Sequence, residues 1–190
     1  MSVKRKKTIL RTIRLPRELD DILQIDAQEN DLSVNALLNK IITKYIEWDR
    51  HVHKFGFVSI ASETFRAILE EVDKDKIENV ARNLGNNMPQ AVTMFWFKRA
   101  TLETLLTVLS LFGKYSNLHT NEMKMDEKGY TITFHHNLGA KWSIFLRHFI
   151  SQFIKSVVGI EPEAEITGSL VTISFPSKIN RKTKKENTYS

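Results

Sequence analysis

The side chains with the clearest chemical potential are lysines and arginines gathered at the two ends of the 190-residue chain. Residues 1–17 contain seven basic side chains and no acidic one, so they carry a charge of +7. Residues 178–190 contain five bases and one acid and carry +4. Because the whole chain has a net charge of +6, residues 18–177 must carry −5. Two basic ends on an acidic body indicate a polyanionic partner such as nucleic acid. Basic tails that only aid solubility are the alternative.

Catalytic and metal-binding chemistry has little support in the sequence. The chain has no cysteine, which excludes disulfides, thiol catalysis and zinc sites built with cysteine. It also lacks a phosphate-cradling glycine loop, a G-x-S-x-G motif and an H-E-x-x-H motif. Among the histidines, the adjacent His135 and His136 would face opposite sides of a strand, and His119 is placed to meet one of them across a hairpin. We expect no enzyme activity, no cofactor and no metal site.

The composition is that of an ordinary globular protein. Hydrophobic residues make up 42% of the chain and charged residues 26%. The length suits one larger domain or two small ones. No apolar run approaches the roughly 18 residues that a membrane span needs, and a charged segment lies where a signal peptide would be apolar. We expect a cytoplasmic protein that does not bind a membrane.

The first 55 residues have the pattern of one strand followed by two helices. Thr8–Leu15 is rich in β-branched and apolar residues and predicts a strand. Pro16 is suited to the start of a helix, which Asn30 and Asp31 would end because both tolerate a left-handed backbone. Ser33 is a typical N-cap for a second helix running to about residue 54, before Gly56.

A single strand leaves its backbone donors and acceptors unpaired, and two helices of this size form a marginal core. Pairing Thr8–Leu15 with the same segment of a second chain solves both problems. The sequence therefore predicts a twofold-symmetric homodimer with a two-stranded antiparallel ribbon over four helices.

The run ILRTIRLPRELDDILQIDAQENDLSVNALLNKIITKY carries a family resemblance. Its alternating strand ending in IRLP, its first apolar helix and the serine before the second helix resemble the ribbon-helix-helix regulators of the Arc, MetJ and CopG type. The resemblance covers residues 8–45, with Asp31 where many members have glycine. It implies that the ribbon of the dimer enters the major groove of DNA.

The resemblance also implies which residues would touch DNA. In the family register Ile13 and Leu15 pack inward, whereas Thr8 and the base-contacting residues point outward. The implied base contacts are Leu10, Thr12 and Arg14, and the implied backbone contacts are Ser33, Val34, Asn35, Lys4, Arg5, Lys6 and Lys7. Arg11 on the inward side breaks the alternation, so a register shifted by one residue stays open, as does an ordinary edge strand in a larger sheet.

The rest of the chain predicts an α+β domain. Residues 57–115 have helical periodicity, with helices expected after Ser62, from Asp73 to Gly85, from Pro89, and from Thr101 to Gly113. Residues 119–125 and 130–136 then predict one hairpin, residues 140–158 an apolar helix, and residues 163–167 and 170–175 a second hairpin. This ββαββ order predicts an antiparallel sheet covered by a helix.

The predicted organisation has four parts: a basic arm (1–7), a ribbon-helix-helix domain (8–55), an α+β regulatory or oligomerisation domain (56–177) and a basic disordered tail (178–190). The predicted function is sequence-specific, prokaryotic transcription regulation by a nucleoid-associated repressor. Its partners would be double-stranded DNA with short symmetric or repeated half-sites and a second copy of the chain. The alternatives are an antitoxin-like protein-interaction module and an architectural nucleic-acid-binding protein. The α+β domain would bind a small-molecule effector in an apolar pocket, mediate further association or simply enlarge the protein.

Overall fold

The computed structural model describes residues 8–177. The predicted arm residues Lys4, Arg5, Lys6 and Lys7 and the predicted tail lie outside the described residues. Contacts divide the chain into two units, Met1–Asp49 and Arg50–Ser190, which are described one at a time. Within residues 8–177, no helix has both the length and the apolar character needed to cross a bilayer.

The first unit contains the two predicted helices. Helix α1 spans Arg17–Glu29 and α2 spans Val34–Lys44, followed by a π-helical turn at Tyr45–Asp49. The helical run continues into the second unit as α3, Arg50–Phe55, and stops at Gly56 as predicted. The unit boundary thus falls inside this run, six residues before the predicted end of the domain. Residues 8–16 form neither a helix nor a hydrogen-bonded strand in the single chain.

The turn between α1 and α2 explains how the chain reverses without glycine. The Leu32 amide donates to the Ala27 carbonyl at 2.8 Å, and the Asp31 amide donates to the Gln28 carbonyl at 3.2 Å. These two bonds define a Schellman motif, whose central residue must have a left-handed backbone. Asp31 supplies it with a φ of 53°. The prediction that Asn30 and Asp31 end the first helix is confirmed.

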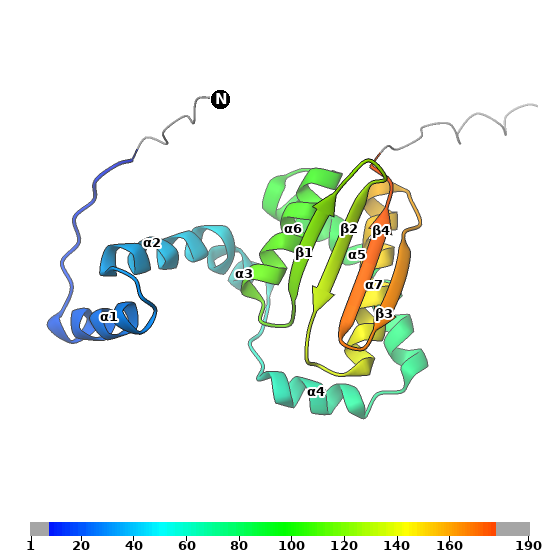
Figure 1. Ribbon diagram of the computed structural model, residues 1–190, viewed down its shortest axis with the longest axis horizontal. Helices are drawn as coiled ribbons and strands as arrows, with labels where there is room; N and C mark the ends of the chain where they lie inside the picture. The colour runs from blue at the N-terminus through cyan, green and yellow to red at the C-terminus, as the bar shows by residue number, and fades with distance from the viewer. Residues whose placement is uncertain (1–7, 178–190) are drawn as a thin grey trace, which may run out of the picture. The chain divides into compact units, whose positions relative to one another are not determined.

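The second unit is built on a four-stranded antiparallel sheet in the order β1-β2-β4-β3 (Figure 1). The strands are β1 (Thr120–Met125), β2 (Tyr130–His135), β3 (Glu163–Thr167) and β4 (Leu170–Phe175). Helix α7, Ala140–Val158, connects the two hairpins and packs on one face of the sheet. On this side the central strands bury apolar side chains, while their alternate residues are threonines, serine and other partly exposed side chains. The predicted α+β arrangement with two hairpins is confirmed.

Three further helices complete the second unit. Helix α4 spans Ser62–Glu70, α5 spans Lys74–Phe97 and α6 spans Leu102–Tyr115. Helix α5 packs along α7, on the side away from the sheet, and α6 lies next to β1 (Figure 1). Thr101 caps α6 as predicted, since its hydroxyl accepts the Thr104 amide while the Thr104 hydroxyl accepts the Thr101 amide.

The predictions that helices end at Gly85 and begin at Pro89 are wrong, because α5 runs through both residues. Gly85 lies against α7, where an added Cβ would stand 2.7 Å from the Phe149 carbonyl oxygen. Glycine therefore serves a close helix–helix contact here. Pro89 has no amide to donate to the Gly85 carbonyl four residues earlier. The Ser156 hydroxyl of α7 lies 3.5 Å from that carbonyl and 3.0 Å from the Phe153 carbonyl, so its single proton is shared between two acceptors.

The predicted helix end at Gly113 is also wrong, by two residues, because α6 continues to Tyr115. The side chain of Asn121 in β1 occupies the space beside Gly113, where a Cβ would meet it at 2.6 Å. The side-chain amide of Asn121 also donates a hydrogen bond to the Leu109 carbonyl. As at Gly85, the glycine allows close packing inside a helix.

Replacing Gly85 by alanine tests the contact between α5 and α7. The added Cβ would meet Gln152 Cβ at 2.8 Å, so one of the helices must move. We expect Gly85→Ala to lower the free energy of unfolding by about 1–3 kcal/mol in spite of the better helix propensity of alanine. The matched control is Asn83→Ala on the exposed face of the same helix, which should not destabilise. Urea unfolding measures both, and a stabilised Gly85→Ala protein would contradict the packing explanation.

Candidate functional site

The first unit exposes most of its apolar side chains. Within residues 8–49 only Ala27 and Trp48 are buried. On α1, Leu19, Ile22 and Ile25 are each at least half exposed. On α2, Ile41 is 48% exposed and Ile42 52%. A small unit with apolar faces of this kind on both helices needs another surface to cover them.

The segment that precedes α1 is also unpartnered. Ile9 is 76% exposed and Leu10 is 91% exposed. Apolar side chains on both faces of the predicted strand 8–15 are therefore in solvent. Within residues 8–177, no backbone hydrogen bond joins this segment to another part of the chain. Its donors and acceptors are thus free to pair with another strand.

The predicted DNA-contacting residues fall into two groups. Leu10, Thr12 and Arg14 are exposed on the irregular segment before α1, whereas Ser33, Val34 and Asn35 start α2. Ser33 caps the helix as predicted, with its hydroxyl accepting the Ala36 amide at 3.2 Å. No hydrogen bond or ion pair that the structure gives for residues 8–177 joins the two groups. The first amides of α2 remain at the exposed, positive end of the helix dipole.

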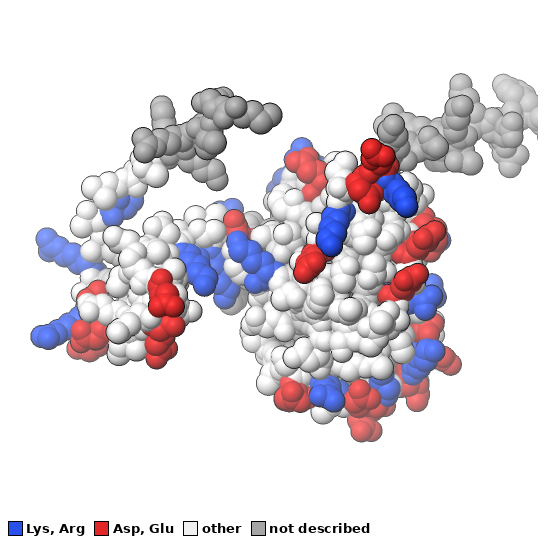
Figure 2. Space-filling view, viewed as in Figure 1, with Lys and Arg blue, Asp and Glu red and all other residues white. Residues whose placement is uncertain are grey.

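The charges of the first unit are spread over its surface. Figure 2 shows acidic and basic side chains at several places on this unit, some of them in contact, with uncharged surface between the groups. Arg17 and Asp21 approach to 3.9 Å, but both are largely exposed, so this ion pair contributes little. Within the described part of the chain, Arg11 and Arg14 form no ion pair. Both guanidinium groups are therefore available for a phosphate or a base edge.

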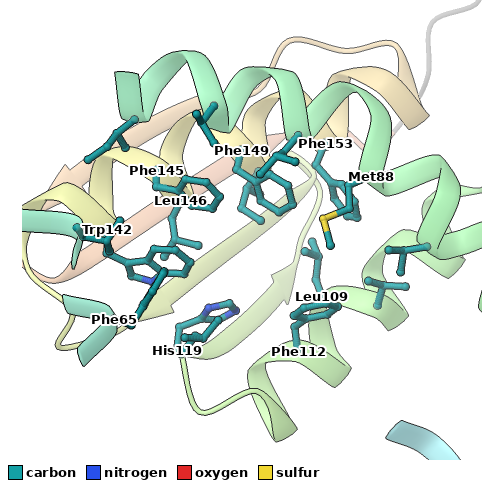
Figure 3. Close-up of a pocket in the computed structure, with 18 of the residues that line it drawn as sticks. Phe65, Met88, Leu109, Phe112, His119, Trp142, Phe145, Leu146, Phe149 and Phe153 are labelled. Atoms are coloured by element: carbon teal, nitrogen blue, oxygen red, sulfur yellow. The ribbon is translucent and has the colours of Figure 1, made fainter. Parts of the chain in front are cut away.

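The second unit contains an apolar cavity of about 470 Å³ (Figure 3). Its wall is formed by side chains of α4, α5, α6 and α7 and by His119 just before β1. Four aromatic residues of α7 form a ladder in which successive rings are stacked at 4.8, 5.4 and 5.6 Å: Trp142, Phe145, Phe149 and Phe153. These four residues pack with the hydrophobic core and also border the cavity.

Two histidines lie buried beside this wall. His119 is 8% exposed and His136 is 7% exposed. His119 directly precedes β1 and His136 directly follows β2, so both lie at the same end of the predicted hairpin. The Leu138 amide donates to His136 Nδ1, so His136 Nε2 carries the proton and donates to the Ser143 hydroxyl at 2.9 Å. Ser143 in turn donates to the Gly168 carbonyl. This chain of bonds holds His136 neutral, and burial lowers its pKa.

His119 has a different environment. Its ring packs edge-on against Phe134 at 5.2 Å, and neither ring nitrogen has a hydrogen-bond partner. Burial, with a smaller effect from His136, lowers the pKa of His119 from 6.5 to about 4. His119 is therefore neutral at pH 7. Within residues 8–177, no three residues of the types His, Asp or Glu are grouped as a metal site requires.

Sequence reasoning named an apolar pocket as one of three alternatives for the α+β domain, but it did not identify the residues that line it or the isolation of His119. The available signals were the aromatic spacing along 142–153 and the placement of His119 opposite His136, and neither distinguishes a filled core from a hollow one. No protein-family model, curated protein or solved structure matches the chain.

The buried state of His119 predicts how stability depends on pH. Its pKa is lower in the folded chain than in the unfolded chain, so the unfolded state binds a proton first as the pH falls. The resulting loss of stability begins near the unfolded pKa of 6.5 and is complete below about 4. We expect this residue to account for about 2 kcal/mol of lost stability between about pH 7.5 and about pH 5.

Urea unfolding of the parent chain and His119→Gln at the two pH values checks this expectation. The variant should lose about 2 kcal/mol less than the parent chain, whatever its stability at pH 7.5. The matched control is His53→Gln, because His53 is exposed on α3 and its removal leaves the buried residues unchanged. Equal pH dependence in His119→Gln and the parent chain would contradict a buried neutral His119.

Proposed function

We propose that the protein is a homodimeric, sequence-specific DNA-binding regulator of transcription that acts as a repressor. The observation that carries the proposal is the exposure of apolar side chains on both helices and on the segment before α1 in the first unit. A second copy offers the same surfaces, so a twofold axis covers all of them at once. The second unit has a core of its own and would act as a regulatory or oligomerisation domain.

The ribbon of this dimer forms from residues 8–15 of both chains. Antiparallel pairing satisfies the backbone groups that the single chain leaves free. Ile13 and Leu15, which are 57% and 38% exposed in the single chain, then cover the helices below the ribbon. The opposite face of the ribbon carries Leu10, Thr12 and Arg14.

A two-stranded ribbon fits the major groove of B-DNA, which is about 12 Å wide. Arg14 is suited to a bidentate hydrogen bond with guanine, and Leu10 to contact with the methyl group of thymine. The Thr12 hydroxyl can either donate a hydrogen bond to a base or accept one from it. The order of these residues on two antiparallel strands favours a site with short symmetric or repeated half-sites.

The first turn of α2 would anchor the dimer to the DNA backbone. The Ser33 side chain is occupied with capping the helix, which leaves the amides of Val34 and Asn35 directed out of the helix end. These amides and the helix dipole suit a phosphate oxygen. The basic residues at positions 4–7 would add phosphate contacts that weaken as salt is raised.

A charge placed on the dimer surface tests the association. Ile42 on α2 and Ile68 on α4 are both 52% exposed, and the second is the matched control because it lies outside the first unit. We expect Ile42→Glu to weaken dimerisation by about 100-fold or more, since it buries two unpaired carboxylates at the twofold interface. Ile68→Glu should leave dimerisation unchanged. Sedimentation equilibrium measures both, and a dimer unaffected by Ile42→Glu would argue against this interface.

Arginine and lysine substitutions test the DNA contacts. Arg14→Ala should relax the sequence preference and cost about 1–3 kcal/mol at the preferred site. Lys6→Ala, outside the described residues, should weaken binding to all sequences alike and reduce the salt dependence. Binding titrations with preferred and scrambled duplexes at two salt concentrations separate the two effects. Identical behaviour of both variants would mean that the other strand register is the correct one.

Selection of genomic fragments with the purified full chain, followed by sequencing, tests the function itself. Enrichment of one short symmetric or repeated motif is the expected result. Uniform recovery of fragments would instead identify an architectural DNA-binding protein, and no recovery would overturn the proposal.

A further inference from the structure

The cavity of the second unit is partly open to solvent and is larger than the voids that packing normally leaves. Protein interiors pack like organic crystals, and few of their voids exceed a water molecule. A volume of about 470 Å³ lies instead within the range of small-molecule sites, about 300–1,000 Å³. Because all of its walls belong to the second unit, the site does not depend on how the two units are arranged.

The wall of the cavity selects an uncharged ligand. It contains aliphatic and aromatic side chains and His119, but no lysine, arginine, aspartate or glutamate. An ion that left water for this space would have no counter-charge. A carboxylate or ammonium group buried against this wall is therefore unfavourable, and an apolar chain gains from leaving water.

The shape of the cavity suits an elongated molecule. The ladder from Trp142 to Phe153 follows one face of α7 for eleven residues, which corresponds to roughly 16 Å of helix. Phe65 continues the aromatic wall from α4, with its ring packed edge-on against Trp142 at 5.3 Å. Figure 3 shows the α7 side chains following one another along the cavity.

Two polar groups beside the wall have no partner inside the protein. The ring nitrogens of His119 and the indole nitrogen of Trp142 are buried and without hydrogen bonds, and both residues border the cavity (Figure 3). Buried polar groups are nearly always paired, which the bonded neighbour His136 illustrates. A turn of the imidazole about its Cβ–Cγ bond, a soft torsion, brings one nitrogen to the cavity.

We propose that the cavity binds an elongated, uncharged apolar molecule with a single hydroxyl or carbonyl group, and that this group hydrogen-bonds to His119. The apolar chain lies along the ladder of α7. The oxygen takes one of the hydrogen bonds that His119 lacks. The site is independent of DNA binding, so its test uses no DNA.

Isothermal titration calorimetry of the full chain with linear alcohols is the first test. We expect saturable binding of 1-octanol, with 1-hexanol and 1-heptanol binding more weakly by about fourfold for each methylene removed. Octanoate at pH 7.5 should bind at least tenfold more weakly than 1-octanol, because its carboxylate would be buried without a partner. These measurements need no variant. Absence of saturable octanol binding, absence of the chain-length dependence, or tighter binding of octanoate would each overturn the proposal.

The second test concerns His119. We expect His119→Leu to weaken 1-octanol binding about fivefold through the lost hydrogen bond. Binding of 1-octanethiol should change little, because it has the same chain and a poor hydrogen-bonding group. His53→Leu is the matched control on the exposed surface of α3 and should bind both probes like the parent chain. An equal loss for the alcohol and the thiol, or no loss for either, would overturn the role of His119.

Discussion

The contact between α5 and α7 is the interaction on which the second unit depends. Gly85 lets the backbones approach, and the Ser156 hydroxyl lies 3.5 Å from the carbonyl that Pro89 leaves without an amide donor. Helix α5 is continuous over 24 residues here, across two residue types that usually interrupt helices. With α5 fixed over α7 and α7 fixed on the sheet, the aromatic side chains of α7 are held between the two layers. The cavity lies beside them.

The two units satisfy the need to bury apolar surface in different ways. The second unit covers one face of its sheet with α7, which α5 covers in turn, and leaves the other face of the central strands partly exposed. The first unit has comparable apolar residues but only two side chains buried among residues 8–49. Its helices are well formed because their caps and turn are local, and their packing surface remains open. In the proposed dimer, the second copy covers the apolar surface that the first unit leaves exposed.

The two buried histidines, His119 and His136, differ in hydrogen bonding because of where they lie. His119 and His136 lie opposite each other on one hairpin, and burial lowers the pKa of both. Only His136 reaches the start of α7, where Ser143 and the Leu138 amide satisfy both of its nitrogens. His119 faces rings and aliphatic side chains instead. The same residue type is thus a structural link at one position and an unsatisfied group at the other.

The sequence by itself determined the elements whose signals are local. The Ser33 and Thr101 caps, the left-handed Asp31, the turns of both hairpins and the limits of α7 follow from residue types within a few positions of each other. The tertiary structure alone decided that Gly85, Pro89 and Gly113 lie inside helices, because the atoms that favour this belong to α7 and β1, far along the chain. It also decided the cavity and the isolation of His119. The cavity depends on which side chains of four helices and of the segment before β1 fail to meet, and the spacing of residues along the chain does not specify those distances.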